Sequence, residues 1–206
     1  MRSGIKTTFA ATAASLTAAL AMAGSASAGV LVQTTTTCPV PLLTQPFKAW
    51  GDGASYELAP GGAAESNTGW TLTGGAGVTS GNEPWKVHSS GDAKSMHLPS
   101  GSSATTTPIC VGLDSPTVRF FTKKNNGLLS TLAVSAVLRP SLGGELVVPV
   151  GVILGGSWSP SPSFLFLGNL LPILPGQYTP VSFRFTPVLG GDWQVDDVYV
   201  DPWKRA

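Results

Sequence analysis

The chain has 206 residues, of which 11% are charged, and its formal net charge at neutral pH is +1. Charges this sparse and balanced, with no cluster of Lys and Arg, exclude the basic surface on which nucleic-acid binding depends. Aliphatic and aromatic residues recur along the whole chain, which excludes a disordered protein. The abundance of Gly, with 25 residues, and Pro, with 17, is typical of a loop-rich β protein.

The first 28 residues have the form of a secretory signal peptide. Arg2 and Lys6 supply positive charge, an apolar Ala-rich run follows, and small residues stand at 25–28, before the expected cleavage site. The run is too short and too rich in Ala, Thr and Ser for a membrane anchor, and no later stretch is apolar enough to span a bilayer. We therefore expect an exported chain of one domain, residues 29–206, with a net charge near −1.

The exported chain is predicted to fold as an all-β sandwich of about eight or nine strands. Strand-like runs alternate with Gly, Pro and Asn turns, and helical periodicity is nearly absent. The runs 129–138 and 145–154 predict a hairpin, while 164–174 is apolar throughout and could be a buried strand or one helical turn. The expected strands are residues 29–35, 54–58, 70–73, 94–98, 117–123, 129–138, 145–154, 179–186 and 193–200.

The chain has two cysteines, Cys38 and Cys110. An even pair in an exported protein predicts a disulfide. It would close a loop of about 70 residues, which is worth about 4 kcal/mol through loop entropy. Two free thiols are the alternative. A catalytic Cys–His pair is not indicated, because neither His88 nor His97 has the surroundings of a nucleophile's partner.

The last predicted strand, DWQVDDVYVD, carries two adjacent aspartates, Asp196 and Asp197. Asp is depleted in strands and is seldom fully buried without a partner. Strict alternation places Asp196 on the face of Val198 and Val200, and Asp197 on the opposite face. If the valines face the core, Asp196 points inward and needs a partner or a metal ion, while Asp197 is expected to face solvent.

This closing strand resembles the last strand of jelly-roll carbohydrate-binding modules with the galactose-binding-like fold. Those modules often open with Gly-x-Phe-Glu followed by Gly-Trp. Here GGAAE at 61–65 precedes Gly69-Trp70, with Ala64 in place of the Phe. The resemblance implies a jelly-roll β-sandwich and a structural Ca²⁺ held by Glu65, Asp196 and backbone carbonyls. The alternative is that both carboxylates cap turns and strand ends. The whole chain also resembles secreted actinobacterial proteins, which implies nothing about activity.

A carbohydrate-binding protein needs exposed aromatic faces on which sugar rings stack. Of the six tryptophans, Trp70 and Trp193 lie in strand patterns and are expected in the core. Four others, Trp50, Trp85, Trp158 and Trp203, lie among Gly, Pro and Ser residues that predict loops, and of these Trp85 and Trp158 are the candidate stacking platforms. For each of them, burial as a core residue or loop anchor is the alternative.

The sequence offers little for catalysis. It has no Gly-x-Ser-x-Gly nucleophile elbow, and the spacing of its two histidines is not that of a zinc site. The predicted function is a secreted, non-catalytic protein that binds a polysaccharide or cell-wall glycan. The first alternative is a structural or adhesive exoprotein of the cell envelope without a small-ligand site, and a small hydrolase is a more distant one.

Overall fold

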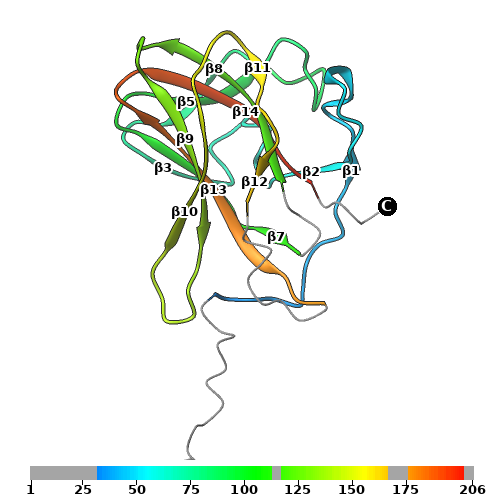
Figure 1. The fold of residues 1–206 in the computed structure, drawn as a ribbon. Helices are drawn as coiled ribbons and strands as arrows, with labels where there is room; N and C mark the ends of the chain where they lie inside the picture. The colour runs from blue at the N-terminus through cyan, green and yellow to red at the C-terminus, as the bar shows by residue number, and fades with distance from the viewer. Residues whose placement is uncertain (1–31, 113–116, 167–175, 202–206) are drawn as a thin grey trace, which may run out of the picture.

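Two antiparallel β-sheets pack face to face (Figure 1). The computed structural model describes residues 32–112, 117–166 and 176–201. The expected signal peptide therefore lies outside the described residues. Within these ranges, helical structure is confined to η1, a short 3-10 turn at Lys48–Trp50, and no helix is long and apolar enough to cross a membrane. The all-β prediction is confirmed.

The first sheet is built around its central strand, β14. Strand β14 pairs along its length with β8, and its other edge pairs with β5 and then β2. The strands of this sheet are β1 (Leu43–Thr44), β2 (Tyr56–Leu58), β4 (Gly77–Ser80), β5 (Lys94–Leu98), β8 (Thr117–Asn126), β11 (Ser159–Pro160), β12 (Phe164–Leu165) and β14 (Asp192–Asp201).

The second sheet is built around β13, which pairs with β9 on one side and with β6 and β7 on the other. The predicted hairpin is confirmed, because β9 and β10 pair antiparallel with Leu138 opposite Leu146. The strands of this sheet are β3 (Trp70–Thr73), β6 (Ser103–Thr106), β7 (Ile109–Val111), β9 (Thr131–Leu138), β10 (Leu146–Ile153) and β13 (Thr179–Val188).

Eight of the nine predicted strands are present, with ends that differ by a few residues. In the described part of 29–35, the pairing is a single bridge between Thr35 and Tyr178. The short strands β1, β4, β6, β7 and β11 were not expected from the sequence. They are short, and β4 and β6 are rich in Gly, Ser and Thr, so their strand character comes from the neighbours with which they pair.

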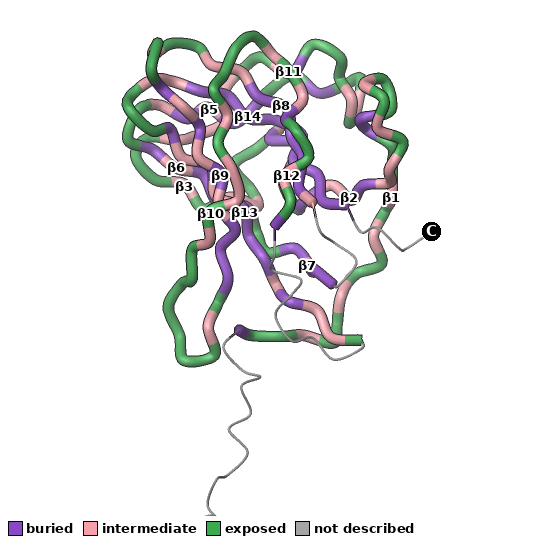
Figure 2. Tube along the Cα trace, in the orientation of Figure 1, coloured by how far each residue is buried: buried purple, intermediate pink, exposed green. Residues whose placement is uncertain are grey.

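The main core lies between the two sheets. From β13, the alternating side chains of Val181, Phe183 and Phe185 are fully buried there, and from β14 Trp193 and Val195 meet them. Figure 2 shows the buried residues running along these central strands. Two facing sheets of this kind give the sandwich that the sequence predicts.

A second hydrophobic cluster covers the outer face of the first sheet. It contains Phe47, Tyr56, Phe121 and Tyr199. On β8 the neighbours Phe120 and Phe121 point to opposite faces, so Phe120 joins the main core while Phe121 joins this second cluster. The first sheet is thus covered on both faces, which explains why β14 is buried over almost its whole length.

Cys38 and Cys110 form the predicted disulfide. Cys110 lies in β7, at the edge of the second sheet, and Cys38 lies 72 residues earlier in the N-terminal segment. The bond therefore ties that segment to the sandwich.

Candidate functional site

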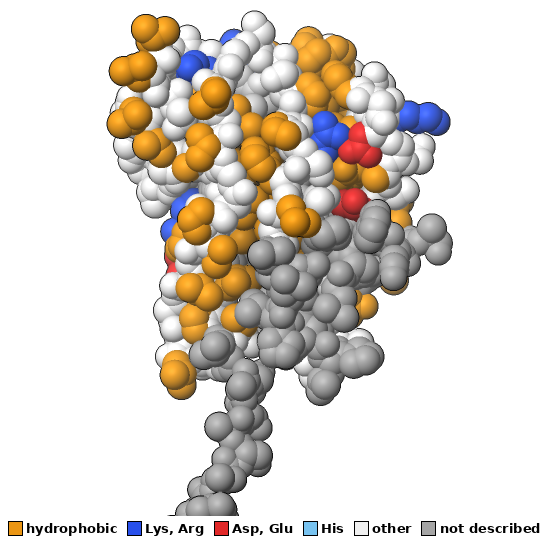
Figure 3. All heavy atoms as spheres, viewed as in Figure 1, with side chains coloured by type: hydrophobic (Ala, Val, Ile, Leu, Met, Phe, Trp, Pro, Cys, Tyr) orange, Lys and Arg blue, Asp and Glu red, His pale blue; other side chains and the backbone are white. Residues whose placement is uncertain are grey.

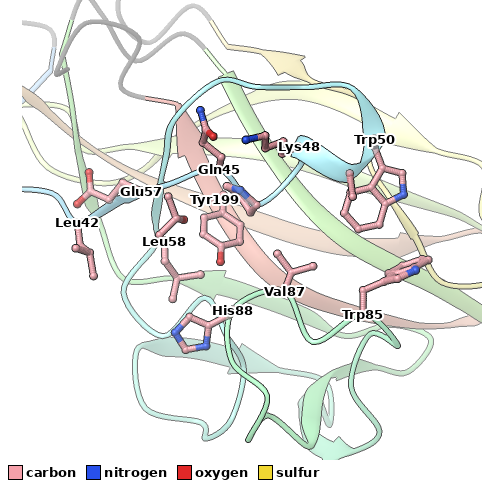
Figure 4. Close-up of a pocket in the computed structure, with 13 residues that line it drawn as sticks. Leu42, Gln45, Lys48, Trp50, Glu57, Leu58, Trp85, Val87, His88 and Tyr199 are labelled. Atoms are coloured by element: carbon pink, nitrogen blue, oxygen red, sulfur yellow. The ribbon is translucent and has the colours of Figure 1, made fainter.

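An open groove lies beside the second hydrophobic cluster, on the outer side of the first sheet. Its volume is about 730 Å³. Figure 4 shows Leu42 and Glu57 toward one end, Trp50 and Trp85 at the other, and Tyr199 between them. Polar side chains are spaced among apolar ones, as is usual in small-molecule sites. The residues that line it are Leu42, Thr44, Gln45, Pro46, Lys48, Ala49, Trp50, Glu57, Leu58, Trp85, Val87, His88 and Tyr199.

Two tryptophans form the aromatic end of the groove. The ring centroids of Trp50 and Trp85 are 5.0 Å apart, with the planes at 86°, and both rings also pack on Phe121. Trp85 keeps 46% of its surface exposed. The predicted platform residue Trp85 therefore lies in an exposed loop at the groove. Trp50 was not a candidate from the sequence, because no local pattern distinguishes it from other loop tryptophans.

The second platform candidate, Trp158, lies elsewhere on the same cluster. It precedes β11, is partly buried and packs against the cluster that contains Phe121. It does not line the groove. Of the two tryptophans expected in the core, Trp193 is fully buried and Trp70 is partly buried against the main core.

The segment that carries Trp50 is held to β8 by a half-buried ion pair. Arg119 on β8 donates to the carboxylate of Asp52, which also accepts from the Tyr56 hydroxyl at 2.7 Å and from the Ala54 N–H at 3.0 Å. Burial acts to raise the pKa of Asp52, but these donors outweigh it and hold the pKa below its ordinary value. The guanidinium of Arg119 also lies 4.1 Å from the centroid of the Phe47 ring.

A β-bulge in β14 changes the expected positions of the two adjacent aspartates. Asp196 is opposite Phe121 and Tyr199 is opposite Arg119, so two residues of β14 face one residue of β8. Asp197, at the bulge, has a left-handed backbone with φ of 48°. The bulge resets the alternation, so that Trp193 and Val195 before it and Val198 and Val200 after it all face the main core.

Two predictions about these aspartates are therefore corrected. Asp196 does not share the face of Val198 and Val200; it lies on the outer face, where it accepts from the Glu83 N–H at 3.0 Å. Its predicted burial is confirmed, but a loop rather than the sandwich core covers it. Asp197 does not face solvent: it is 1% exposed and accepts from the His88 N–H at 3.2 Å.

The loop that covers the bulge, residues 81–92, is organised by a buried carboxylate of its own. Glu83 is fully buried and accepts from the N–H groups of Trp85 at 2.6 Å and Val87 at 2.5 Å. Because one side chain accepts from two loop amides that are two residues apart, Glu83 sets the conformation from which Trp85 projects into the groove.

Burial has a large effect on the aspartates beneath this loop. Desolvation and the neighbouring Asp197 raise the pKa of Asp196 to about 9, although two backbone N–H donors oppose the shift. Desolvation and the nearby Glu83 raise the pKa of Asp197 to about 7, although His88 opposes the shift. Burial is the main cause of both shifts, and the neighbouring carboxylates add to it.

Glu65, the second predicted calcium ligand, lies at the edge of β5. Its carboxylate accepts from the N–H groups of Ala93 at 2.8 Å and Lys94 at 2.9 Å. The predicted proximity of the opening stretch to the closing strand is seen in the backbone, since the Val198 N–H donates to the Gly62 carbonyl at 3.1 Å. The shared calcium ion of Glu65 and Asp196 stays a prediction.

The structure brings together a set of possible metal ligands that the sequence did not indicate. A ring nitrogen of His88 and carboxylate oxygens of Asp92 and Asp197 all lie within 4.8 Å of one another. The His88 Nδ1 is 2.8 Å from the Asp92 carboxylate. Asp197 is 109 residues away from His88 in the chain, so no short motif could have revealed the set.

No protein-family profile matches the sequence, and no curated protein is similar to it. Solved structures do share its fold. The CBM22-1 and GH10 modules of an endo-1,4-β-D-xylanase from Clostridium thermocellum, complexed with xylohexaose, match with a TM-score of 0.50 and 15% identity. This match covers 73% of the chain described here and 29% of the xylanase chain.

Two further structures match with lower scores. The CBM22-1 xylan-binding domain from Paenibacillus barcinonensis has a TM-score of 0.48 and 12% identity, over 74% of this chain and 97% of that one. A family 61 module in complex with β-1,4-galactotriose has a TM-score of 0.41 and 16% identity, over 68% and 93%. The match to the xylanase modules, at 15% identity, is evidence for the fold alone: together with the two antiparallel sheets, it shows that the chain is a jelly-roll β-sandwich of the kind found in carbohydrate-binding modules.

Proposed function

We propose that the protein is a non-catalytic carbohydrate-binding protein and that the groove beside Trp50 and Trp85 holds its ligand. The observation that carries the proposal is the pair of tryptophans in contact at one end of an open groove. An aromatic face matches the apolar C–H face of a sugar ring, and the polar groups farther along the groove can bond its hydroxyls.

The ligand is proposed to be a polysaccharide or cell-wall glycan. The groove is open and has polar side chains along it, including Gln45, Lys48 and Glu57, so it fits several linked sugar units better than a single one. The similar xylanase modules are complexed with xylohexaose, which makes β-1,4-xylan the first ligand to test.

Calorimetric titration with xylohexaose, followed by a glycan array, tests the proposal. We expect saturable binding of at least one oligosaccharide, with a heat-capacity change that reports burial of the tryptophan faces. An array on which no glycan is bound would contradict the proposal.

A structural or adhesive exoprotein remains the alternative function. It is favoured by the apolar edge strand β10, where Leu146, Val147 and Val152 are exposed. Pro149 and a bulge interrupt the backbone of this edge, but its exposed apolar side chains favour contact with another surface. Concentration-dependent self-association, or retention on cell envelopes without glycan binding, would favour this alternative.

We also propose that the protein is exported from the cell. The disulfide and the form of residues 1–28 both support a protein that acts outside the cell. Cleavage after Ala28 would leave Gly29 as the N-terminus of a single-domain chain, which N-terminal sequencing of the secreted protein checks.

We propose that Glu65 and Asp196 bind a structural calcium ion. It is supported by the full burial of Asp196 and by the backbone contact between the opening stretch and β14. Calcium should then raise the melting temperature of chelator-treated protein, and both Glu65→Gln and Asp196→Asn should abolish the rise. A calcium response that both variants retain would contradict it.

A further inference from the structure

The loop 81–92 and the β14 bulge bury several carboxylates with little positive charge nearby. Glu83, Asp92, Asp196 and Asp197 are each at most 6% exposed. Among the described residues, the ion pair made by this group is the one between Asp92 and His88. Buried carboxylates are costly unless they are neutralised by a proton, a basic group or a metal ion.

One oxygen in this group has no partner. The Asp197 Oδ2 accepts from the His88 N–H, but the buried Asp197 Oδ1 has no hydrogen-bond partner in the part of the chain that the structure describes. Leaving a buried charged oxygen unpaired costs more than a hydrogen bond normally contributes. An unpaired oxygen at this depth is therefore a place where a proton or a metal ion can bind.

The unpaired residue belongs to the His88–Asp92–Asp197 set. Because the three ligand atoms lie within 4.8 Å of one another, small side-chain rotations can place them around a common centre. We propose that His88, Asp92 and Asp197 bind one zinc-class divalent metal ion, which fastens the loop 81–92 to β14.

The donor set selects this class of ion. Imidazole nitrogen suits Zn²⁺ and its neighbours in the first transition row, whereas Ca²⁺ and Mg²⁺ take oxygen ligands, and Ca²⁺ takes six to eight of them. One imidazole and two carboxylates give the three protein ligands typical of an open zinc site. This set is separate from Glu65 and Asp196, the pair proposed for calcium.

The metal ion would act on the groove through the loop. His88 lines the groove itself, and Trp85 is three residues before it in the same loop. With the loop held at Glu83 and again at His88 and Asp92, the Trp85 ring would be preorganised against Trp50. This last consequence rests on the proposed function, but the metal site itself does not.

Zinc titration of the purified, chelator-treated protein tests the site. We expect one zinc ion per chain by calorimetry and elemental analysis. At free zinc about 100 times the dissociation constant, the melting temperature should rise by about 5–10 °C. Magnesium at the same concentration should cause no such rise, and any rise with calcium should persist in His88→Gln.

Three variants make the test specific. His88→Gln and Asp197→Asn should each weaken zinc binding at least about tenfold, because each removes a ligand atom. Asp197→Asn should nevertheless melt no lower than the wild type in metal-free buffer, since it removes an unpaired buried charge. His97→Gln is the matched control: His97 also lies 2.8 Å from a carboxylate, that of Asp192, and is similarly exposed, but the described residues place no third ligand beside it. This control should bind zinc normally.

The outcomes separate the proposals. Absence of zinc binding, or equal weakening in His88→Gln and His97→Gln, would overturn the metal site, as would stabilisation by calcium alone. Zinc binding without any glycan binding would support the site while contradicting the proposed function. If both hold, removal of zinc should lower glycan affinity in the wild type and leave it unchanged in Asp197→Asn.

Discussion

Asp197 combines an unusual backbone conformation with a buried side-chain hydrogen bond. Its φ of 48° lies in the left-handed region, which Asp and Asn tolerate better than most residues because their short polar side chains can bond locally. The same conformation turns its carboxylate beneath the loop 81–92, where it meets the His88 N–H. A β-branched residue at this position would lose both features.

Trp85→Ala should weaken glycan binding with little effect on stability. The ring is 46% exposed, so its removal costs little core packing, while loss of a stacking face should cost about 1–1.5 kcal/mol of binding, roughly tenfold in Kd. Calorimetry and thermal melting measure the two effects. Trp158→Ala is the comparison: it should reduce stability and leave affinity unchanged, and the reverse pattern would make Trp158 the platform.

Asp52→Asn should destabilise the protein by about 1–2 kcal/mol at neutral pH, because it leaves the Arg119 guanidinium, 10% exposed, without its carboxylate. The pKa of Asp52 is lowered in the folded state, so its contribution is complete above the ordinary value of 3.8 and is lost as the pH falls below it. Urea unfolding at neutral and acid pH should therefore show the two proteins converging in acid.

The matched control for Asp52→Asn is Glu145→Gln. Glu145 pairs with Arg184 on the surface, where its side chain is 45% exposed, so its loss should cost under about 1 kcal/mol. An Asp52→Asn effect that is no larger than this, or that persists unchanged in acid, would contradict the role given to the ion pair.

At the scale of the element, the β14 bulge depends on the strand end beside it. The Val198 N–H donates to the Gly62 carbonyl, and the Val198 carbonyl accepts from Ala59, so the bulged backbone is bonded to the turn after β2. The close approach needs a residue without a side chain, because a Cβ on Gly62 would lie 2.7 Å from the Val198 carbonyl oxygen.

Gly62→Ala should therefore destabilise the fold by about 1–3 kcal/mol, since the backbone on both sides must shift to accept the methyl group. Gly53→Ala is the control, because the space around Gly53 is open and its backbone is not left-handed. Chemical denaturation of the two variants gives the comparison. Equal stability of the two would show that the turn and the bulge are not closely coupled.

At the scale of the whole molecule, the first sheet lies between two apolar layers, the main core and the second hydrophobic cluster. The main core joins the two sheets, and the second cluster joins the first sheet to the N-terminal segment and the loop 81–92. On the face of the molecule shown in Figure 3, charged side chains are few. Because the groove is formed where these covering segments meet, its shape depends on how firmly they are attached.

Removal of the disulfide tests how firmly the N-terminal segment is attached to the sandwich. The paired substitutions Cys38→Ser and Cys110→Ser should reduce stability by up to about 4 kcal/mol, the loop-entropy value for a closure of 72 residues. Intact mass after alkylation without reduction should show no free thiol in the native protein. Two alkylated cysteines would contradict the pairing.

The sequence by itself determined the parts of this protein that depend on local pattern. Alternation in Val181–Phe185 and the turn residues between apolar segments are local properties. They predicted nine strands, of which eight are present, and also the β9–β10 hairpin and the sandwich. The disulfide was predicted from the even number of cysteines and from the expected export of the chain. Trp85 was recognisable because its Gly, Asn and Pro neighbours mark an exposed loop.

Only the tertiary structure decided the features that arise from contacts between distant residues. The bulge at Asp197 depends on pairing with β8, and without it strict alternation gives the wrong face for both aspartates. Trp50 joins Trp85 only because the N-terminal segment packs on β8, and His88 meets Asp197 only because the loop 81–92 covers β14. Periodicity reports which side of one strand is apolar, but it carries no information on what covers the other side.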